Sequence, residues 1–264
     1  MSKYLYVFSL TLQNTLQRRA SLLMDRVGGL AAFLALYFFW SAVLGTKDGF
    51  LGYSRAQMLS YILLMNLLRA FVFTGRGWEL VSEISSGKIS SYLLRPISYL
   101  GYTLSQDLAQ KSIHLVSAVL EVAVLVMLVG APVYVPERAS TWLLFIAAAA
   151  MSSVIFFLLE FIVSSLAFWT SESGGPLFCF ELFLQFAAGT FFPIDVLPAG
   201  LQSALRLTPF PYLVFFPINI YLERASTSEA LRLLAIEAAW LAAIYVAARI
   251  VWARGVRNYA AEGG

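Results

Sequence analysis

The chain has 264 residues, of which 60% are hydrophobic and only 12% are charged. A soluble domain carries about 25% charged residues, so the composition excludes a soluble globular protein and predicts an all-α, polytopic membrane protein. The 18 Lys and Arg residues against 15 Asp and Glu residues indicate basic loops rather than nucleic-acid binding, and the single cysteine excludes an internal disulfide.

The first segment, residues 3–22, is amphipathic. Its polar residues lie away from a face that carries Leu5, Phe8, Leu12 and Leu16. This pattern predicts an N-terminal helix that lies in the membrane interface and leads into the first span. A simple cytosolic tail is the alternative.

Six apolar runs follow, each long enough to be a candidate membrane span. About 20 apolar residues are needed to cross roughly 30 Å of hydrocarbon. The runs lie at about 27–45, 55–74, 109–130, 141–169, 175–192 and 229–252.

The distribution of basic residues predicts the orientation. Arg69 and Lys111 are boundary cases and are left out of the count. With the N-terminus inside, the inner segments hold ten basic residues: Lys3, Arg18, Arg19, Arg26, Arg76, Lys88, Arg95, Arg249, Arg254 and Arg257. The outer segments hold six: Lys47, Arg55, Arg138, Arg206, Arg224 and Arg232. This excess predicts that both termini are cytoplasmic.

A polar strip, residues 75–98, separates the second and third runs and contains the sequence EISSGKISSYLLRPI. Trp78, Val81 and Ile84 recur at helical spacing, and Gly87 is suited to end a helix. We therefore expect a short amphipathic helix parallel to the membrane, able to dock into a groove of a partner. A solvated loop that merely connects two spans is the alternative.

The segment 191–223 is apolar, yet it contains five of the nine prolines: Pro193, Pro198, Pro209, Pro211 and Pro217. Prolines break a continuous helix, and unsatisfied backbone is not tolerated facing lipid. We expect short helices that pack on protein or re-enter the membrane from outside, with an ordinary outer loop as the alternative.

Catalytic and cofactor-binding patterns are missing. His114 is the one histidine, no set of ligands has metal-site spacing, and no G-x-S-G protease motif occurs. Gly87–Lys88 resembles the end of a phosphate-binding loop, but Ser82 and Ile89 stand where that motif needs Gly and Ser or Thr. We expect no enzyme activity and no cofactor in this chain.

Four glutamates fall within the predicted spans: Glu121, Glu160, Glu181 and Glu237, with Arg69 as the main basic counterpart. Ionised groups cost at least ~2.5 kcal/mol each at the bilayer centre, so they should face a cavity, a partner or an interface. We hypothesise a path for hydrophobic cations, lined by Glu121, Phe157, Glu160, Phe161 and Trp169. Alternatively, Glu181 lies near a helix N-terminus and Glu237 near the outer interface, where carboxylates are tolerated.

The motif E-I-x-x-G-K-I-x-x-Y-L-L-R-P-I at 83–97, together with F-F-P-I-D-x-L-P at 191–198, resembles the permease subunits of ABC transporters of the ABC-2 class. The resemblance runs the length of the chain, as one transmembrane permease domain over 1–264. It implies that the strip is a coupling helix that contacts a separate ATPase subunit. The implied interface residues are Glu79, Glu83, Ile84, Gly87, Leu94, Arg95 and Pro96.

The resemblance also implies partners and a mechanism. Two permeases, either identical copies or sister subunits, work with two ABC ATPase subunits that bind ATP and Mg in the bacterial inner membrane. The complex would export a lipophilic small molecule by alternating access, and the glutamate path hypothesised above would suit a cationic one. An ATP-independent channel or carrier is the alternative, and a membrane scaffold without transport is a third interpretation.

Overall fold

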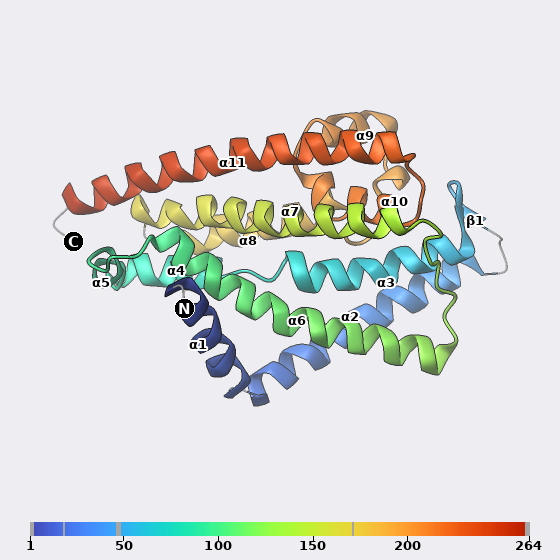
Figure 1. The fold of residues 1–264 in the computed structure, drawn as a ribbon, viewed down its shortest axis with the longest axis horizontal. Coiled ribbons are helices and arrows are strands. Elements are labelled where there is room, and N and C mark those ends of the chain that lie inside the picture. Colours follow the sequence, from blue (N-terminus) through green and yellow to red (C-terminus); the bar gives the residue numbers. More distant parts are fainter. Residues whose placement is uncertain (1–2, 18, 46–48, 171, 262–264) are drawn as a thin grey trace.

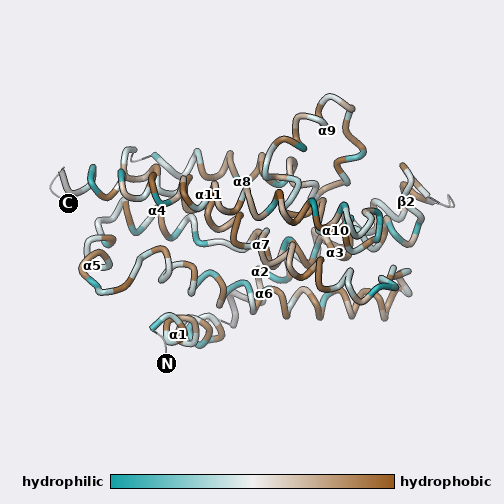
Figure 2. The backbone as a smooth tube through the Cα atoms, turned by 45° about the horizontal axis from the view of Figure 1, so that its top comes forward, coloured by the Kyte–Doolittle hydropathy of each residue, from teal (hydrophilic) through white to brown (hydrophobic). Residues whose placement is uncertain are grey.

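The computed structural model describes residues 3–17, 19–45, 49–170 and 172–261, without the side chains of 19–23, 25, 260 and 261. Arg18 and Lys47, which enter the charge count above, lie outside the described residues. The chain is largely helical, and apolar residues predominate along its long helices (Figure 2).

In the described part of the chain, five helices are long and apolar enough to cross a membrane. They run along the long axis of the molecule (Figure 1). These helices are α2 (Arg19–Leu44), α3 (Arg55–Val72), α6 (Tyr99–Val129), α7 (Ala139–Ser164) and α11 (Thr227–Ala261). The protein is therefore a multi-pass α-helical membrane protein.

The fifth predicted span corresponds to α8 (Gly174–Ala188), which has only 15 residues. At 1.5 Å per residue it is about 22 Å long, short of the ~30 Å hydrocarbon layer. Gly189 ends it in a left-handed conformation with φ 83°. The count of six spanning helices is thus not confirmed.

The third predicted span begins earlier than its apolar run, because α6 starts at Tyr99 rather than near residue 109. The hydroxyls of Thr103 and Ser105 donate to the backbone carbonyls of Tyr99 and Gly101, at 3.0 and 2.7 Å. Such bonds satisfy polar side chains within the helix, so hydropathy underestimates its length.

The two ends of the molecule differ. One end holds α4 (Gly77–Ser85), α5 (Ile89–Leu93) and both chain ends (Figure 1). The other holds the antiparallel strands β1 (Gly49–Phe50) and β2 (Tyr53–Ser54). Helix α7 runs towards the first end, where η1 (Ser165–Phe168) follows it, and α11 starts at the second end. The chain therefore returns between them through α8 and the short helices that follow it: η2 (Ile194–Val196), α9 (Ala199–Arg206), η3 (Phe210–Leu213) and α10 (Phe215–Tyr221).

Helix α1 (Lys3–Gln17) lies across the long helices and packs on α6 (Figures 1 and 2). The contact is close at Gly101, where a Cβ would approach the Tyr4 ring to 2.7 Å. Lys3 Nζ donates to the carbonyl of Pro96 at 2.7 Å, which joins α1 to the end of the polar strip. Leu5 and Leu16, on the predicted apolar face, are more than half exposed.

Helix α3 is the most buried of the five long helices, whereas α6 and α11 bury few of their residues and expose apolar side chains such as Leu128 and Val246. In a membrane this exposed surface contacts lipid or another subunit. The core is thus centred on α3 and its contacts with α6, α7 and α2.

Asp195, in the second sequence motif, joins several elements at the end that carries the strands. Its carboxylate accepts from the Tyr53 hydroxyl at 2.8 Å and lies 3.8 Å from the guanidinium groups of both Arg206 and Arg224. Arg224 also stacks over the Tyr53 ring, 3.6 Å from its centroid. The proline-rich segment is therefore fixed to β2 by charge as well as by packing.

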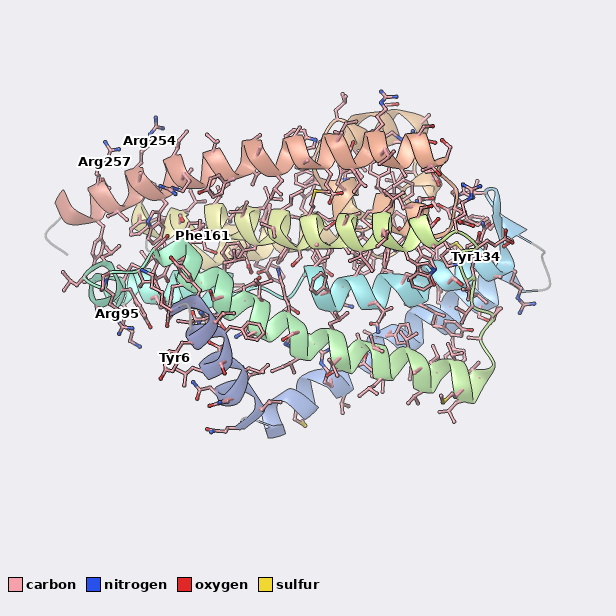
Figure 3. The ribbon with its side chains drawn as sticks, in the orientation of Figure 1. Tyr6, Arg95, Tyr134, Phe161, Arg254 and Arg257 are labelled. Carbon is pink, nitrogen blue, oxygen red and sulfur yellow. The ribbon has the colours of Figure 1, made fainter. Side chains whose placement is uncertain are left out.

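Glu223 forms a second junction at this end, near Tyr134 (Figure 3). Its carboxylate accepts from the hydroxyls of Tyr134 and Thr141, both at 2.9 Å, and from the N–H groups of Glu137 and Arg138 at 3.4 and 3.3 Å. Burial alone would raise the pKa of Glu223, but these hydrogen bonds outweigh it and lower the pKa. Burial and the bond to Glu223 raise the pKa of Tyr134 to about 12.

Because the folded pKa of Glu223 lies below its ordinary value of 4.5, its ionisation stabilises the fold above that pH. This contribution is lost as the pH falls through the folded pKa. We expect Glu223→Gln to unfold at a lower temperature than the wild type at pH 7, with the difference shrinking below about pH 4.5. Thermal unfolding in detergent at several pH values measures this. Glu137→Gln, at an exposed side chain, is the control, and a pH-independent difference for Glu223→Gln would contradict the prediction.

Candidate functional site

The polar strip folds as two short helices joined by a glycine turn. Helix α4 begins at Gly77 and ends at Ser85, and Gly87 follows with φ 74°, in the left-handed region that glycine adopts without strain. The Gly87 N–H donates to the Ile84 carbonyl at 3.0 Å, and α5 starts two residues later. We call residues 75–98 the coupling segment from here on.

One face of the coupling segment packs against the long helices. Leu80, Ile84 and Ile89 are all buried. Trp78 and Glu79, on the other face of α4, are exposed. A short helix with one buried face is therefore present, but its buried face carries Leu80 and Ile84 and not Trp78, which the sequence placed on the apolar side. The buried residues are used for packing within the chain.

A buried carboxylate on α7 caps the N-terminus of α4. Glu160 is 4% exposed, and its Oε2 accepts from the Arg76 N–H at 3.1 Å. A Cβ at Gly75 or Gly77 would overlap with the Glu160 side chain, so only glycine allows this approach. A carboxylate in this position satisfies unpaired N–H groups and complements the positive end of the helix dipole.

We call the side-chain contacts that hold the coupling segment on the long helices its ties. The Glu160 cap is the first, and Glu83 forms the second, to α6. Its carboxylate accepts a hydrogen bond from the Tyr99 hydroxyl and lies 3.9 Å from the Arg76 guanidinium. The Arg76 side chain also donates to Gln106. Tyr99 in turn stacks on Trp252 of α11, with 4.8 Å between ring centroids.

A third tie runs from the glycine turn to α11. The Tyr259 hydroxyl lies 2.8 Å from the Ser90 hydroxyl and contacts Gly87. The coupling segment is thus held by α6, α7 and α11 together.

The tip of the coupling segment is free of these ties. Leu94 is 88% exposed, and Arg95 and Pro96 are exposed beside it. Arg95 lies at the same end of the molecule as Arg254 and Arg257 (Figure 3). The sequence-predicted interface therefore divides into an exposed set, Glu79, Leu94, Arg95 and Pro96, and a set that contacts the chain itself, Glu83, Ile84 and Gly87.

Behind Glu160, α6 carries a fully buried ion pair that the sequence analysis missed. Asp107 and Lys111 are four residues apart, both 0% exposed, with 2.8 Å between Oδ2 and Nζ. Lys111 Nζ also donates to the Ser153 carbonyl of α7 at 3.0 Å. The spacing of opposite charges on one helix was the available signal.

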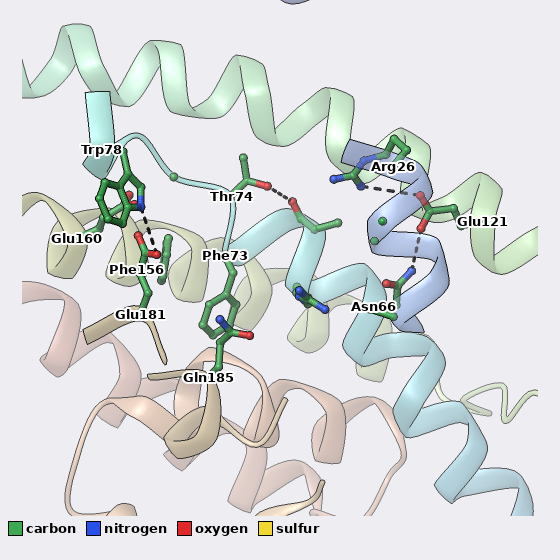
Figure 4. A pocket seen from close by; sticks show the side chains of 16 residues that line it. Arg26, Asn66, Phe73, Thr74, Trp78, Glu121, Phe156, Glu160, Glu181 and Gln185 are labelled. Atoms are coloured by element: carbon green, nitrogen blue, oxygen red, sulfur yellow. Dashed lines mark hydrogen bonds and ion pairs between the residues drawn. The ribbon is translucent and has the colours of Figure 1, made fainter. Parts of the chain in front are cut away.

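A cavity of about 450 Å³ lies between α2, α3, α4, α7 and α8, with Glu121 of α6 in its wall (Figure 4). At one end, Glu121 accepts from Asn66 at 3.3 Å and lies 3.9 Å from Arg26. At the other end, Trp78 Nε1–H donates to Glu181 at 3.4 Å, close to Glu160. Arg69, the basic residue expected to accompany the glutamates, also lines the cavity. The basic side chain that lies beside Glu121, however, is that of Arg26.

The residues of the predicted cation path are only partly together. Glu121 and Glu160 both line the cavity. Phe157 and Phe161 are buried outside it, where Phe161 packs on Trp252 at 5.0 Å between centroids. Trp169 is 47% exposed beside Phe168.

The two other glutamates differ from expectation. Glu181 lies in the middle of α8 rather than at its N-terminus. Glu237 is 2% exposed and accepts from the Ser152 hydroxyl at 3.0 Å, so it is buried against α7. Within the described residues, no group of three or more His, Cys, Asp or Glu side chains could hold a metal ion.

Gly77→Ala should destabilise the protein, because the added Cβ would lie 2.7 Å from Glu160 Cγ and 2.8 Å from Ser164 Oγ. Overpacking of this kind costs about 1–3 kcal/mol. Thermal unfolding in detergent measures it. Gly200→Ala is the matched control, since nothing lies within 4 Å of its Cβ position, and equal stability of the two variants would contradict the tight junction.

Comparison with known proteins covers nearly the whole chain. The model of the ABC-2 family transporter proteins matches residues 30–263, which include all five long helices in whole or in part, the coupling segment and the proline-rich segment. No curated protein matches the chain. Proteins of this family are membrane components of ABC transporters, and their association with ABC ATPases follows from the family. The chain belongs to the ABC-2 family of transporter proteins and is a transmembrane permease.

Proposed function

We propose that this permease is driven by a separate ABC ATPase subunit that docks on the tip of the coupling segment. The observation that carries the proposal is the division of that segment into an anchored face and a free tip. Leu94 is 88% exposed and lies beside Arg95, at the end where Arg254 and Arg257 also lie (Figure 3). An exposed leucine with a neighbouring arginine is a suitable anchor for a partner groove.

In this proposal the coupling segment and both termini are cytoplasmic, in a bacterial inner membrane. The excess of basic residues at that end supports the orientation. Helix α1 lies in the inner interface, and α8 with the residues up to 192 makes a sixth crossing. The segment 191–223, which holds the short helices after α8, re-enters the membrane from outside. The Asp195 and Asn219 side chains accept from the Tyr53 hydroxyl, at 2.8 and 3.3 Å, so the segment is held against protein rather than lipid at these points.

Force is transmitted through the three ties of the coupling segment. ATP and Mg bind in the ATPase subunits, whose closure displaces the tip. Because Glu160, Tyr99 and Tyr259 connect the segment to α7, α6 and α11, the displacement moves three long helices together. The permease, paired with a second copy or a sister subunit, then alternates between inward-open and outward-open states and exports a lipophilic small molecule.

An ATP-independent channel or carrier is the rival function. For it, the coupling segment would be an ordinary connecting loop. The arrangement around Leu94 favours the ATPase-driven permease, because this exposed leucine and the exposed Arg95 stand at the tip of a segment whose other face is anchored to the long helices, as a docking element requires.

Leu94→Ser and Arg95→Glu should each weaken ATPase docking by about tenfold or more, because they remove an exposed anchor residue or reverse its charge. The measurement is the amount of ABC ATPase that co-purifies from the native host in mild detergent, together with substrate-stimulated ATP hydrolysis. Leu207→Ser is the matched control, at a leucine 79% exposed in the proline-rich segment. A wild-type protein that transports without ATP, or variants that keep the ATPase, would refute the proposal, and an ATPase unaffected by any substrate would favour a scaffold.

A further inference from the structure

We propose that the cavity between α2, α3, α4, α7 and α8 binds an organic cation. Its charge would be received by Glu160 and Glu181. The same Glu160 carboxylate would connect the bound cation to the coupling segment. The binding site itself stands on the cavity alone, whereas its link to transport rests on the proposed function.

The chemistry of the cavity wall favours a cation at one end. Glu160 and Glu181 lie there with the aromatic rings of Trp78 and Phe156, while Arg26, Asn66 and Glu121 lie at the opposite end (Figure 4). Carboxylates combined with aromatic faces recognise organic ammonium groups, through charge and through the ring quadrupole. The volume of about 450 Å³ is within the range of small-molecule sites.

The formal charge of the cavity wall also favours a bound cation. Among the described lining residues, the three carboxylates of Glu121, Glu160 and Glu181 face the two guanidinium groups of Arg26 and Arg69, which leaves a formal charge of −1. Neither Glu160 nor Glu181 has a basic side chain within 4.0 Å in the described part of the chain. An unpaired charge is unfavourable inside a bilayer. One monovalent cation in the cavity would neutralise the charge of −1.

The nearby basic residues are already occupied. Lys111 is paired with Asp107 at 2.8 Å, and the Arg76 guanidinium lies 3.9 Å from Glu83. If Lys111 turned to the cavity acids, Asp107 would be left buried without its partner, which is strongly unfavourable. If Arg76 turned, Glu83 would keep only the hydrogen bond from the Tyr99 hydroxyl.

Glu160 gives the site a connection to the coupling segment. Its carboxylate caps the start of α4 through the Arg76 N–H and at the same time forms part of the cavity wall. A cation that draws this carboxylate towards the cavity weakens the cap. The first turn of α4 then becomes freer to move, so occupancy of the cavity would be sensed at the coupling segment.

Binding to the full-length chain in nanodiscs tests the site, without any ATPase. Benzyltrimethylammonium is the probe, and benzylsulfonate, an anion of similar size, is its counterpart; calorimetry measures both. We expect the cation to bind and the anion not to bind. Glu181→Gln and Glu160→Gln should each weaken cation binding about tenfold, and Glu229→Gln, at an exposed position in α11, should not.

Glu160→Gln separates charge from folding, because the glutamine side-chain oxygen can still accept from the Arg76 N–H. A variant with wild-type unfolding temperature and weakened binding supports a charge role. Equal binding of cation and anion, no binding of the cation, or unchanged binding in both variants overturns the site. If the ATPase still co-purifies in that case, the proposed function is unaffected. If the cation binds but no ABC ATPase co-purifies from the native host, only the proposed function is refuted.

Amide hydrogen exchange tests the connection between the bound cation and the coupling segment. In the wild type, the cation should accelerate exchange in a peptide covering residues 75–80, and Glu160→Gln should reduce this response. The peptide covering residues 199–206, in α9 at the far end of the molecule, should not respond (Figure 1). Cation binding with unchanged exchange at 75–80 would overturn the link while leaving the site in place.

Discussion

The hydrogen bond between the Arg76 N–H and the Glu160 carboxylate is the interaction on which the position of the coupling segment depends. Each of these two groups, the N–H and the carboxylate, is energetically unfavourable when it is buried without a hydrogen-bond partner. A helix N-terminus leaves N–H groups unpaired, and a carboxylate buried within a membrane bundle loses its hydration. Together they satisfy each other, and the glycines at 75 and 77 make the close approach possible. The start of α4 is therefore specified by a residue of α7.

The other ties of the coupling segment share this design, because each joins it to a long helix through a side-chain contact. Tyr99 on α6 donates to Glu83, and Tyr259 on α11 contacts Ser90. The stacking of Tyr99 on Trp252 then connects α6 to α11 directly. With its apolar face used inside the chain, the segment exposes its tip, around Leu94, together with Glu79 of α4. Attachment on one side and exposure on the other are the features on which the proposed transmission of force depends.

The sequence was sufficient for features that depend on local pattern. Long apolar runs predicted the five long helices. The spacing of Trp78, Val81 and Ile84 with Gly87 predicted a short helix and the turn that ends it, although the buried face of α4 carries Leu80 rather than Trp78. Features that depend on contacts between distant residues were not accessible. The Glu160 cap joins residues 84 positions apart, and nothing near either residue indicates it.

Apolar periodicity was also unable to distinguish the faces of a helix that is apolar all round. Phe157, Glu160 and Phe161 are close together on α7, so they were expected to share one path. Only Glu160 faces the cavity, while the two phenylalanines pack in the aromatic core. Helix α8 was overestimated for a related reason, because the apolar run continues beyond Gly189, where the backbone turns left-handed and the helix stops.

The buried pair of Asp107 and Lys111 has a consequence for biogenesis. Both residues belong to α6 and are four positions apart, so they can meet as soon as this helix forms, before any neighbouring helix has arrived. Each charge alone would oppose entry from the translocon into lipid. As a locally formed pair they present no net charge, which lowers the cost of moving α6 into the bilayer, and in the assembled bundle the Ser153 carbonyl of α7 accepts a further hydrogen bond from the ammonium group.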